Sequence, residues 1–179
     1  MSPIATIKAF DRLLADRDLT FEGVAIGGTA LVLLGVIERA TKDCDILWPE
    51  LPAEIVQAAR DFARATTLAG ENLRDDWFNN GPASLIRDLS PGWEQRLQPV
   101  FAGHSLVLRT LGRSDLLCAK LFALCDRQID LTDCLALAPS PRELRDVLPW
   151  LEDRDANPDW PSHVRSTIAD LGRRLGHGS

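Results

Sequence analysis

Two aspartates two positions apart, Asp43 and Asp45, are the residues whose type and spacing most clearly suggest chemistry. They lie in an apolar segment, residues 41–48, that ends at Pro49 and predicts a β-strand. Side chains alternate along a strand, so we expect both carboxylates on one face and Cys44 on the other. Two acids on one face repel unless a cation lies between them, and oxygen ligands suit Mg²⁺. The pair therefore predicts a Mg²⁺ site that activates an attacking oxygen and neutralises a triphosphate; a solvated strand end is the alternative.

A glycine pair, Gly27 and Gly28, separates a predicted buried strand at residues 21–26 from a predicted helix at residues 29–37. Glycine lets backbone N–H groups approach a ligand closely, and a helix N-terminus favours phosphate. Thr29 adds a hydroxyl group. The turn is a candidate phosphate-binding site, with a plain tight turn as the alternative. It matches neither the P-loop pattern nor G-x-G-x-x-G, which excludes both of those nucleotide sites.

Three polar residues crowd the approach to the two aspartates: Arg39, Thr41 and Lys42. Arg39 and Thr41 share the register of the aspartates if the strand begins early. We expect the three side chains to bind phosphate or to orient the acids. Local charge balance is their simpler role.

A second group of charged residues lies on and just after a predicted helix at residues 114–127. Lys120 and Arg127 share one face of this helix, and two cations on one face suit a triphosphate. The alternative is a solvated face on which Arg127 pairs with Asp130. Asp130 and Asp133 are one helical turn apart, so we expect them to pair with the two cations or to cap the helix junction.

Local signals predict the elements that must position these residues. Ser2-Pro3 predicts the start of a helix, and Ser140-Pro141-Arg142-Glu143 predicts a capping box. Residues 70–82 predict a loop. The remaining predicted strands are residues 84–86, 97–101 and 105–111, and the remaining helices are residues 52–66, 131–137 and 162–175. The order predicts an α+β fold, with a small mixed sheet flanked by helices in residues 1–112 and a helical region packed on that core in residues 113–179.

The composition is that of an ordinary globular protein, with 179 residues, 45% hydrophobic and 26% charged. A net charge of -6 predicts no global attraction to nucleic acid or to an anionic membrane. No apolar run reaches transmembrane length, and the first residues predict no secretory signal. The four cysteines form no C-x-x-C pair, so we expect reduced thiols in a cytoplasmic protein. His104 and His163 have no second ligand at metal spacing, so we expect them to be structural or solvated.

The motifs, taken in order, are similar to those of a known superfamily. VAIGGTA at residues 24–30 and RATKDCD at residues 39–45 resemble the opening motif of the DNA polymerase β-type nucleotidyltransferases. The resemblance is closest to a minimal bacterial branch that includes the AbiEii-type abortive-infection toxins. That branch also has segments like WFNNG at residues 77–81, and like the helix from Lys120 to Arg127 with its D-x-x-D step.

The resemblance implies a nucleotidyltransferase fold and transfer of a nucleoside monophosphate from an NTP to an acceptor hydroxyl, with release of pyrophosphate. In the toxin branch the acceptor can be tRNA, so tRNA or another RNA and a cognate antitoxin protein are implied partners. The implied phosphate-binding residues are Gly27, Gly28 and Thr29. Lys120 and Arg127 are implied to contact the phosphates of the nucleotide. Asp43 and Asp45 would bind Mg²⁺. Asp130 would have a supporting or catalytic position.

The sequence departs from the superfamily pattern in one respect that bears on catalysis. Superfamily polymerases place a third carboxylate on a later strand, and residues 97–101 and 105–111 contain none. This favours a second hypothesis, a non-catalytic nucleotide-binding or protein-interaction module on the same fold. A third is adenylylation of a small cationic antibiotic, for which Trp77, Trp93 and the acidic balance would be suited; packing in the core is the ordinary role of such tryptophans.

Overall fold

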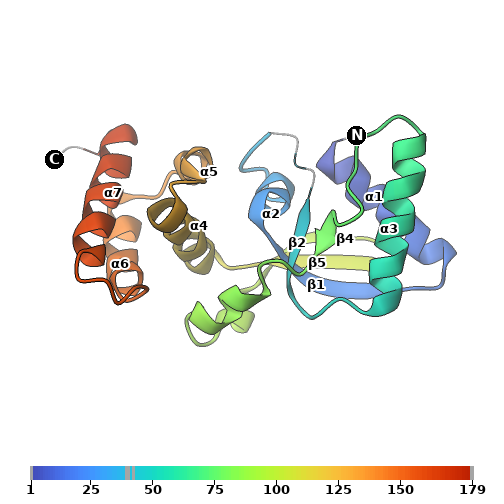
Figure 1. The fold of residues 1–179 in the computed structure, drawn as a ribbon, viewed down its shortest axis with the longest axis horizontal. Helices are drawn as coiled ribbons and strands as arrows, with labels where there is room; N and C mark the ends of the chain where they lie inside the picture. Colours follow the sequence, from blue (N-terminus) through green and yellow to red (C-terminus); the bar gives the residue numbers. More distant parts are fainter. Residues whose placement is uncertain (1, 39–40, 42, 178–179) are drawn as a thin grey trace. The chain divides into compact units, whose positions relative to one another are not determined.

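The structure, a computed structural model, describes residues 2–38, 41 and 43–177 in two compact units. The N-terminal unit ends at Gly112 and the C-terminal unit begins at Arg113 (Figure 1). Within the described residues, no helix is both long and apolar enough to cross a membrane.

The N-terminal unit is built on a five-stranded sheet with the strand order β3-β2-β1-β5-β4. Strand β1 pairs antiparallel with β2 and parallel with β5, β3 pairs parallel with β2, and β4 pairs antiparallel with β5. The strands are β1 (Phe21–Ile26), β2 (Cys44–Trp48), β3 (Phe78–Asn79), β4 (Gln98–Ala102) and β5 (Leu106–Thr110). The sheet is therefore small and mixed, as predicted.

Helices flank this sheet. The α-helices are α1 (Pro3–Asp16), α2 (Gly27–Leu33) and α3 (Ala53–Leu68), and two 3₁₀ turns are η1 (Ala83–Asp88) and η2 (Trp93–Arg96). Helix α1 begins where predicted, because the Ser2 hydroxyl accepts the N–H of Ala5 and Pro3 occupies the first helical position. Side chains of α1 and α3 share one core with alternate residues of β1, β2 and β5, so both helices cover the same face of the sheet (Figure 1).

Aromatic rings fill the centre of that core. Trp77 contacts the rings of Phe10, Phe62 and Phe78 at centroid distances of 5.2, 5.6 and 5.3 Å. Its indole N–H donates to the backbone oxygen of Ala59 at 3.0 Å. Since Trp77 and Trp93 are both buried, these tryptophans have the packing role, and the hypothesis of a cationic antibiotic substrate loses them as contacts.

Four predicted elements differ from the structure. Helix α2 spans Gly27–Leu33, so it begins two residues and ends four residues earlier than predicted. Strand β2 begins at Cys44, three residues later than expected, so Asp43 lies just before the strand. Residues 84–86 belong to the 3₁₀ turn η1 and not to a strand. The strand prediction was wrong because three residues beside Pro82 are too few to show a period. The predicted loop at residues 70–82 contains β3, whose two residues are set by pairing with β2 and not by any local pattern.

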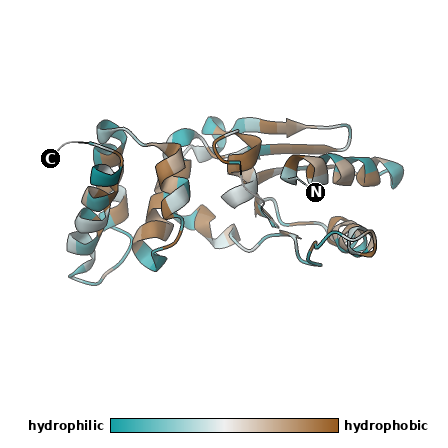
Figure 2. Ribbon diagram, turned by 90° about the horizontal axis from the view of Figure 1, so that it is seen from above, coloured by the Kyte–Doolittle hydropathy of each residue, from teal (hydrophilic) through white to brown (hydrophobic). Residues whose placement is uncertain are grey.

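The C-terminal unit consists of helices α4 (Arg113–Arg127), α5 (Leu131–Leu137), α6 (Pro141–Glu152) and α7 (Trp160–Arg174). The capping box predicted for α6 is present: the Ser140 hydroxyl accepts the N–H of Glu143 at 3.2 Å, and the Glu143 carboxylate accepts the N–H of Ser140 at 2.8 Å. Hydrophobic and hydrophilic residues interleave along these helices (Figure 2), so each helix has an apolar side to bury. The helices predicted for this part of the chain are confirmed.

Candidate functional site

Asp45 lies in the middle of the sheet, between the end of β1 and the short strand β3. It is paired with Ile26 on one side and with Asn79 on the other. Its neighbour Cys44 is buried in the α1–α3 core, so alternation directs Asp45 to the opposite face, as predicted. Burial, aided by the charge of Asp45, raises the pKa of the Cys44 thiol far above its usual range. Cys44 is thus a neutral core residue, and the carboxylate of Asp45 remains the candidate site group at this position.

The glycine turn directly adjoins this carboxylate. Gly27 has a φ of +74°, a left-handed conformation that side chains disfavour. A Cβ atom on Gly27 would lie 2.7 Å from Oδ2 of Asp45, closer than such contacts allow. Helix α2 begins at Gly27 itself, with Gly28 and Thr29 in its first turn. The sequence motif therefore reflects two requirements at one position, a backbone angle and room for Asp45.

Two threonines hold the backbone of Asp43. The hydroxyls of Thr29 and Thr41 both donate to the backbone oxygen of Asp43, at 2.5 and 3.2 Å. Thr29 is only 3% exposed. Thr29 was expected to bind phosphate, and Thr41 to bind phosphate or to orient the acids. In the structure both hydroxyls donate to the backbone of the residue that precedes β2. Arg39 and Lys42, predicted beside them, lie outside the described residues.

One oxygen of the Asp43 side chain is unsatisfied among the described residues. Its Oδ1 atom is buried and has no hydrogen-bond partner among the residues that the structure describes. A buried carboxylate oxygen without a donor is costly, and a hard cation would satisfy it. The donor set of Asp43 and Asp45 thus fits Mg²⁺. In the described part of the chain, however, no cluster of three or more His, Cys, Asp or Glu side chains could hold a metal.

The segment before and within β3 adds two residues that the sequence did not single out. Asn79 donates from Nδ2 to Oδ1 of Asp45 at 3.2 Å. Arg74 binds Asp76 through two hydrogen bonds of 2.9 and 2.6 Å, and its pKa is raised by Asp76 and, to a smaller extent, by the charge of Asp43. The segment WFNNG at residues 77–81 resembles a family motif. Only the pairing of β3 with β2 shows which of its polar residues forms a hydrogen bond with Asp45.

The acidic residue that is buried as a whole in the described part of the N-terminal unit, Asp11, is structural. Asp11 accepts the backbone N–H groups of Ser105 and Leu106 at 2.8 Å each and that of His104 at 3.2 Å. Burial alone would raise the pKa of Asp11, but these three donors outweigh it and hold the pKa below its ordinary value. Asp11 fixes the β4–β5 turn, so it does not supply the missing third carboxylate.

Lys120 and its acidic partners form a buried group in the C-terminal unit. Lys120 Nζ lies 3.0 Å from Oδ2 of Asp130 and 2.8 Å from Oδ2 of Asp133. Lys120 is 6% exposed, whereas Arg127 is exposed and lies 3.6 Å from Asp126. The predicted pairing of Lys120 with the two acids is confirmed, and the pairing of Arg127 with Asp130 is wrong. Lys120 and Arg127 do not share a solvated face, because two acids after the helix draw Lys120 inward.

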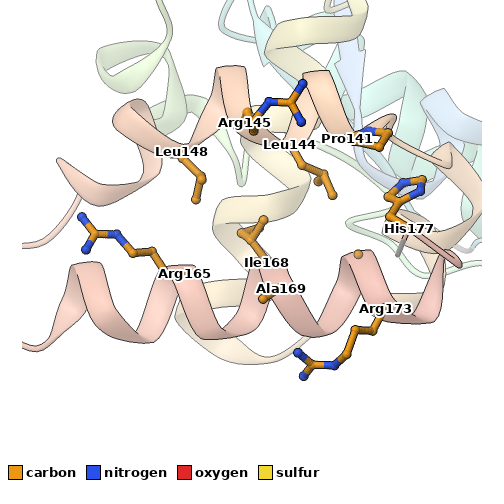
Figure 3. Close-up of a pocket in the computed structure, with 10 residues that line it drawn as sticks. Pro141, Leu144, Arg145, Leu148, Arg165, Ile168, Ala169, Arg173 and His177 are labelled. Atoms are coloured by element: carbon orange, nitrogen blue, oxygen red, sulfur yellow. The ribbon is translucent and has the colours of Figure 1, made fainter. Parts of the chain in front are cut away.

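The C-terminal unit also has a groove between α6 and α7, with a volume of about 320 Å³. Figure 3 shows Leu144, Leu148 and Ile168 toward the space between the two helices, with Arg145 and Arg165 at its edges. No acidic residue is among the described residues that line it. The groove therefore offers no carboxylate for Mg²⁺ among these residues, and the candidate site stays with the aspartates of the N-terminal unit.

Comparison with known proteins identifies a family. A model of the family described as "Nucleotidyltransferase of unknown function (DUF6036)" matches residues 4–138, which is more than half of the chain. No curated protein and no solved structure matches the chain. The matched residues include the glycine turn, both aspartates, Asn79 and helices α4 and α5.

Proposed function

The chain belongs to this family of nucleotidyltransferases, and on that premise we propose that it transfers a nucleoside monophosphate from an NTP to an acceptor hydroxyl with the help of Mg²⁺. The main support is the buried oxygen of Asp43, which has no hydrogen-bond partner among the described residues and belongs to the residue two positions before Asp45. A cation at these oxygens would offset the charge of the triphosphate and increase the reactivity of the attacking oxygen. Asp43 and Asp45 are the residues proposed to hold it.

The proposed reaction is an in-line displacement at the α-phosphorus of the NTP. The acceptor oxygen forms a bond to that phosphorus, the bond to the bridging oxygen of the β-phosphate breaks, and pyrophosphate leaves. The proton of the acceptor hydroxyl passes to solvent. Because such a transition state is loose, positioning and charge are the main contributions a protein can make.

The chain's own residues are assigned to positioning. Thr29 and Thr41 fix the backbone of Asp43, so the point from which its carboxylate projects is set before any ligand binds. The N–H groups of the Gly27–Gly28 turn are proposed to contact phosphate oxygens, and Arg74, whose charge interacts with Asp43, is a candidate for the same role. Figure 1 shows the turn where β1 meets α2.

Residues of the C-terminal unit and residues outside the described chain complete the assignment. Lys120 and Arg127 are proposed to contact the nucleotide phosphates, with Asp130 in a supporting or catalytic position. In the structure, Asp130 and Asp133 bind Lys120, so phosphate contact would require Lys120 to exchange these partners. Arg39 and Lys42 are further proposed phosphate ligands.

The acceptor proposed from the resemblance to AbiEii-type toxins is tRNA or another RNA, with a cognate antitoxin as a protein partner and the cytoplasm as the location. The net charge of -6 gives no general attraction to RNA, so binding would depend on a local basic surface.

The test is a transfer assay with Mg²⁺, each of the four NTPs labelled at the α-phosphate, and total tRNA, protein or small acceptors. We expect label on one acceptor class, and a loss of about 100-fold or more in Asp43→Asn and Asp45→Asn, as for removal of a main electrostatic contributor. Arg127→Gln should lose less. The absence of transfer to every acceptor, with Asp43→Asn indistinguishable from the wild type, would contradict the proposal.

A second candidate function is a nucleotide-binding or interaction module without turnover. It is favoured by the two carboxylates found where three are usual, in the described part of the chain. Calorimetry with an NTP and Mg²⁺, followed by analysis of the nucleotide, separates the two. Binding with intact NTP in the presence of every acceptor class supports the module, and release of pyrophosphate rejects it.

A further inference from the structure

The strand that adjoins Asp45 carries an amide and not an acid. Strand β3 pairs parallel with β2 in a register that puts Asn79 directly beside Asp45. Laterally paired residues of neighbouring strands point to the same face of a sheet, so Asn79 shares the face of Asp45. The Nδ2 group of Asn79 donates to Oδ1 of Asp45 at 3.2 Å. The polar neighbour of Asp45 across the sheet is therefore a neutral hydrogen-bond donor.

The orientation of the Asn79 amide is fixed by its other contacts. Its Oδ1 atom accepts the N–H of Gly81 at 2.6 Å, and Nδ2 also donates to the backbone oxygen of Asp76 at 3.2 Å. A rotated amide would place its NH₂ group against the N–H of Gly81, which is also a donor. The network therefore requires that the NH₂ end faces Asp45.

Asp45 is held from two sides. Asn79 binds Oδ1, while Oδ2 lies so close to the backbone of Gly27 that a Cβ atom there would be 2.7 Å away. A carboxylate between a rigid backbone and a fixed amide donor has little freedom to rotate. Preorganisation of this kind is what second contacts to metal ligands supply.

We propose that Asn79 is a positioning residue for Asp45, and that its neutral side chain fills the place beside Asp45 where a third carboxylate could stand. The inference rests on the proposed function, because it assumes that Asp43 and Asp45 bind a divalent cation. It leaves the site with two negative charges, and so with weaker cation affinity than three acids would provide. It also assigns the departure from three carboxylates to one residue, Asn79, which lies outside the predicted strands at residues 97–101 and 105–111.

This arrangement makes Asn79→Asp and Asn79→Ala change metal affinity in opposite directions. Alanine removes the donor that orients Asp45, so Mn²⁺, a spectroscopically convenient probe, should bind about 10-fold more weakly. Aspartate loses the same donor but adds a third oxygen ligand with charge, so Mn²⁺ should bind about 10-fold more tightly. A residue with a purely structural role would not give affinity changes of opposite sign.

The experiment is calorimetry with Mn²⁺ on the full chain, comparing the wild type with Asn79→Ala, Asn79→Asp and Asp43→Asn. Asn157→Asp is the control for added charge, because Asn157 lies in the C-terminal unit and uses its side-chain oxygen to accept the N–H of Asp159, which aspartate can also do. Gly81→Ala is a second variant that keeps the amide: its Cβ would lie 2.8 Å from Oδ1 of Asn79 and should displace it, weakening Mn²⁺ binding.

The expected result is binding that Asp43→Asn abolishes, Asn79→Ala and Gly81→Ala weaken, Asn79→Asp strengthens and Asn157→Asp leaves unchanged. Equal affinities in the folded wild type and in all variants at positions 79 and 81, with Asp43→Asn still inactive in binding, would overturn the inference and leave the proposed function standing. A wild type that binds no Mn²⁺ and transfers no nucleotide would overturn both.

Discussion

At the residue scale, the hydroxyl groups of Thr29 and Thr41 could bind either a ligand or a nearby backbone oxygen, and the structure shows the second. Thr29 follows the Gly27-Gly28 turn and Thr41 precedes the two aspartates, so either hydroxyl is near residues proposed to bind phosphate or Mg²⁺. In the structure both donate to one backbone oxygen, that of Asp43. For the buried hydroxyl of Thr29 such a bond is favoured, because a buried donor without a partner costs about 1–3 kcal/mol. The threonines thus act on the site through the position of Asp43.

Gly27→Ala is expected to damage the site and not only the fold. The left-handed backbone angle should cost about 1–2 kcal/mol in stability, and the new Cβ would press on Oδ2 of Asp45 at 2.7 Å. The variant should therefore lose most of its transfer activity and Mn²⁺ affinity. Thermal unfolding and the transfer assay measure the two effects separately.

Gly35→Ala is the matched control, because Gly35 has a φ of +71° and no atom within 4 Å of the position that its Cβ would occupy. It should lose a similar amount of stability and keep its activity. If both glycine variants lose activity in proportion to stability, the contact between Gly27 and Asp45 has no role in the site.

The sequence predicted part of this arrangement. Strand alternation correctly separated Asp45 from Cys44, because that rule is local. It could not be applied to Asp43, which lies before the strand begins. Asn79 was not predicted as a site residue, because its position depends on a pairing between segments 34 residues apart in the sequence. Local pattern contains no information about such a pairing.

At the scale of elements, helices with strong end signals were predictable and short strands were not. Ser2 and Ser140 each cap a helix through a hydroxyl within three residues, so the signal and the structure are both local. Strand β3 has two residues, which is too short for any periodicity. Its existence follows from the edge of β2, which offers backbone groups that need partners.

Lys120→Met tests the buried charge group that connects α4 with the start of α5. Removal of the lysine leaves Asp130 and Asp133 close together without their cation, so the C-terminal unit should lose about 3–5 kcal/mol of stability. Urea unfolding followed by helical circular dichroism measures the loss. Arg127→Met, on the same helix but exposed, should cost less than about 1 kcal/mol.

The triple variant Lys120→Met, Asp130→Asn, Asp133→Asn should recover part of the loss, because no unpaired charge is left buried. If Lys120→Met is as stable as Arg127→Met, the ion pairs contribute little, and Lys120 would be free to serve the nucleotide at no cost to the fold.

The start of α6 should weaken in acid through Glu143. Hydrogen bonds from Arg113 and from Ser140 outweigh the effect of burial and lower the pKa of Glu143 from 4.5 to about 2. A carboxyl whose pKa is depressed in the folded state stabilises that state above its unfolded pKa, and this stabilisation is lost as the pH falls through the folded value. The contribution of Glu143 should thus be complete above about pH 5 and decline toward pH 2.

Glu143→Gln isolates this contribution, because glutamine keeps the shape and does not titrate. The difference in melting temperature between the wild type and Glu143→Gln should be largest near neutral pH and shrink as the pH is lowered from 5 to 2.5. A difference that stays constant over that range would show that the carboxylate charge does not stabilise the helix start.

At the scale of the whole molecule, the proposed metal ligands and the residues that hold them belong to one unit. Asp43, Asp45, Gly27 and Asn79 all precede Gly112, where the N-terminal unit ends. The family match extends beyond this unit, to residue 138, and so includes Lys120, Asp130 and Asp133. Metal binding and nucleotide transfer are therefore expected to differ in how much of the chain they need.

A fragment of residues 1–112 should bind Mn²⁺ with an affinity within about threefold of the full chain, since each described group proposed to hold the ion or its ligands is present in it. The same fragment should not transfer nucleotide, because the family match continues to residue 138. Calorimetry and the transfer assay on the fragment, with circular dichroism to confirm that it folds, test both statements. A folded fragment that has lost Mn²⁺ binding would mean that a ligand comes from beyond Gly112, and a fragment with full transfer activity would remove Lys120 and Asp130 from the reaction.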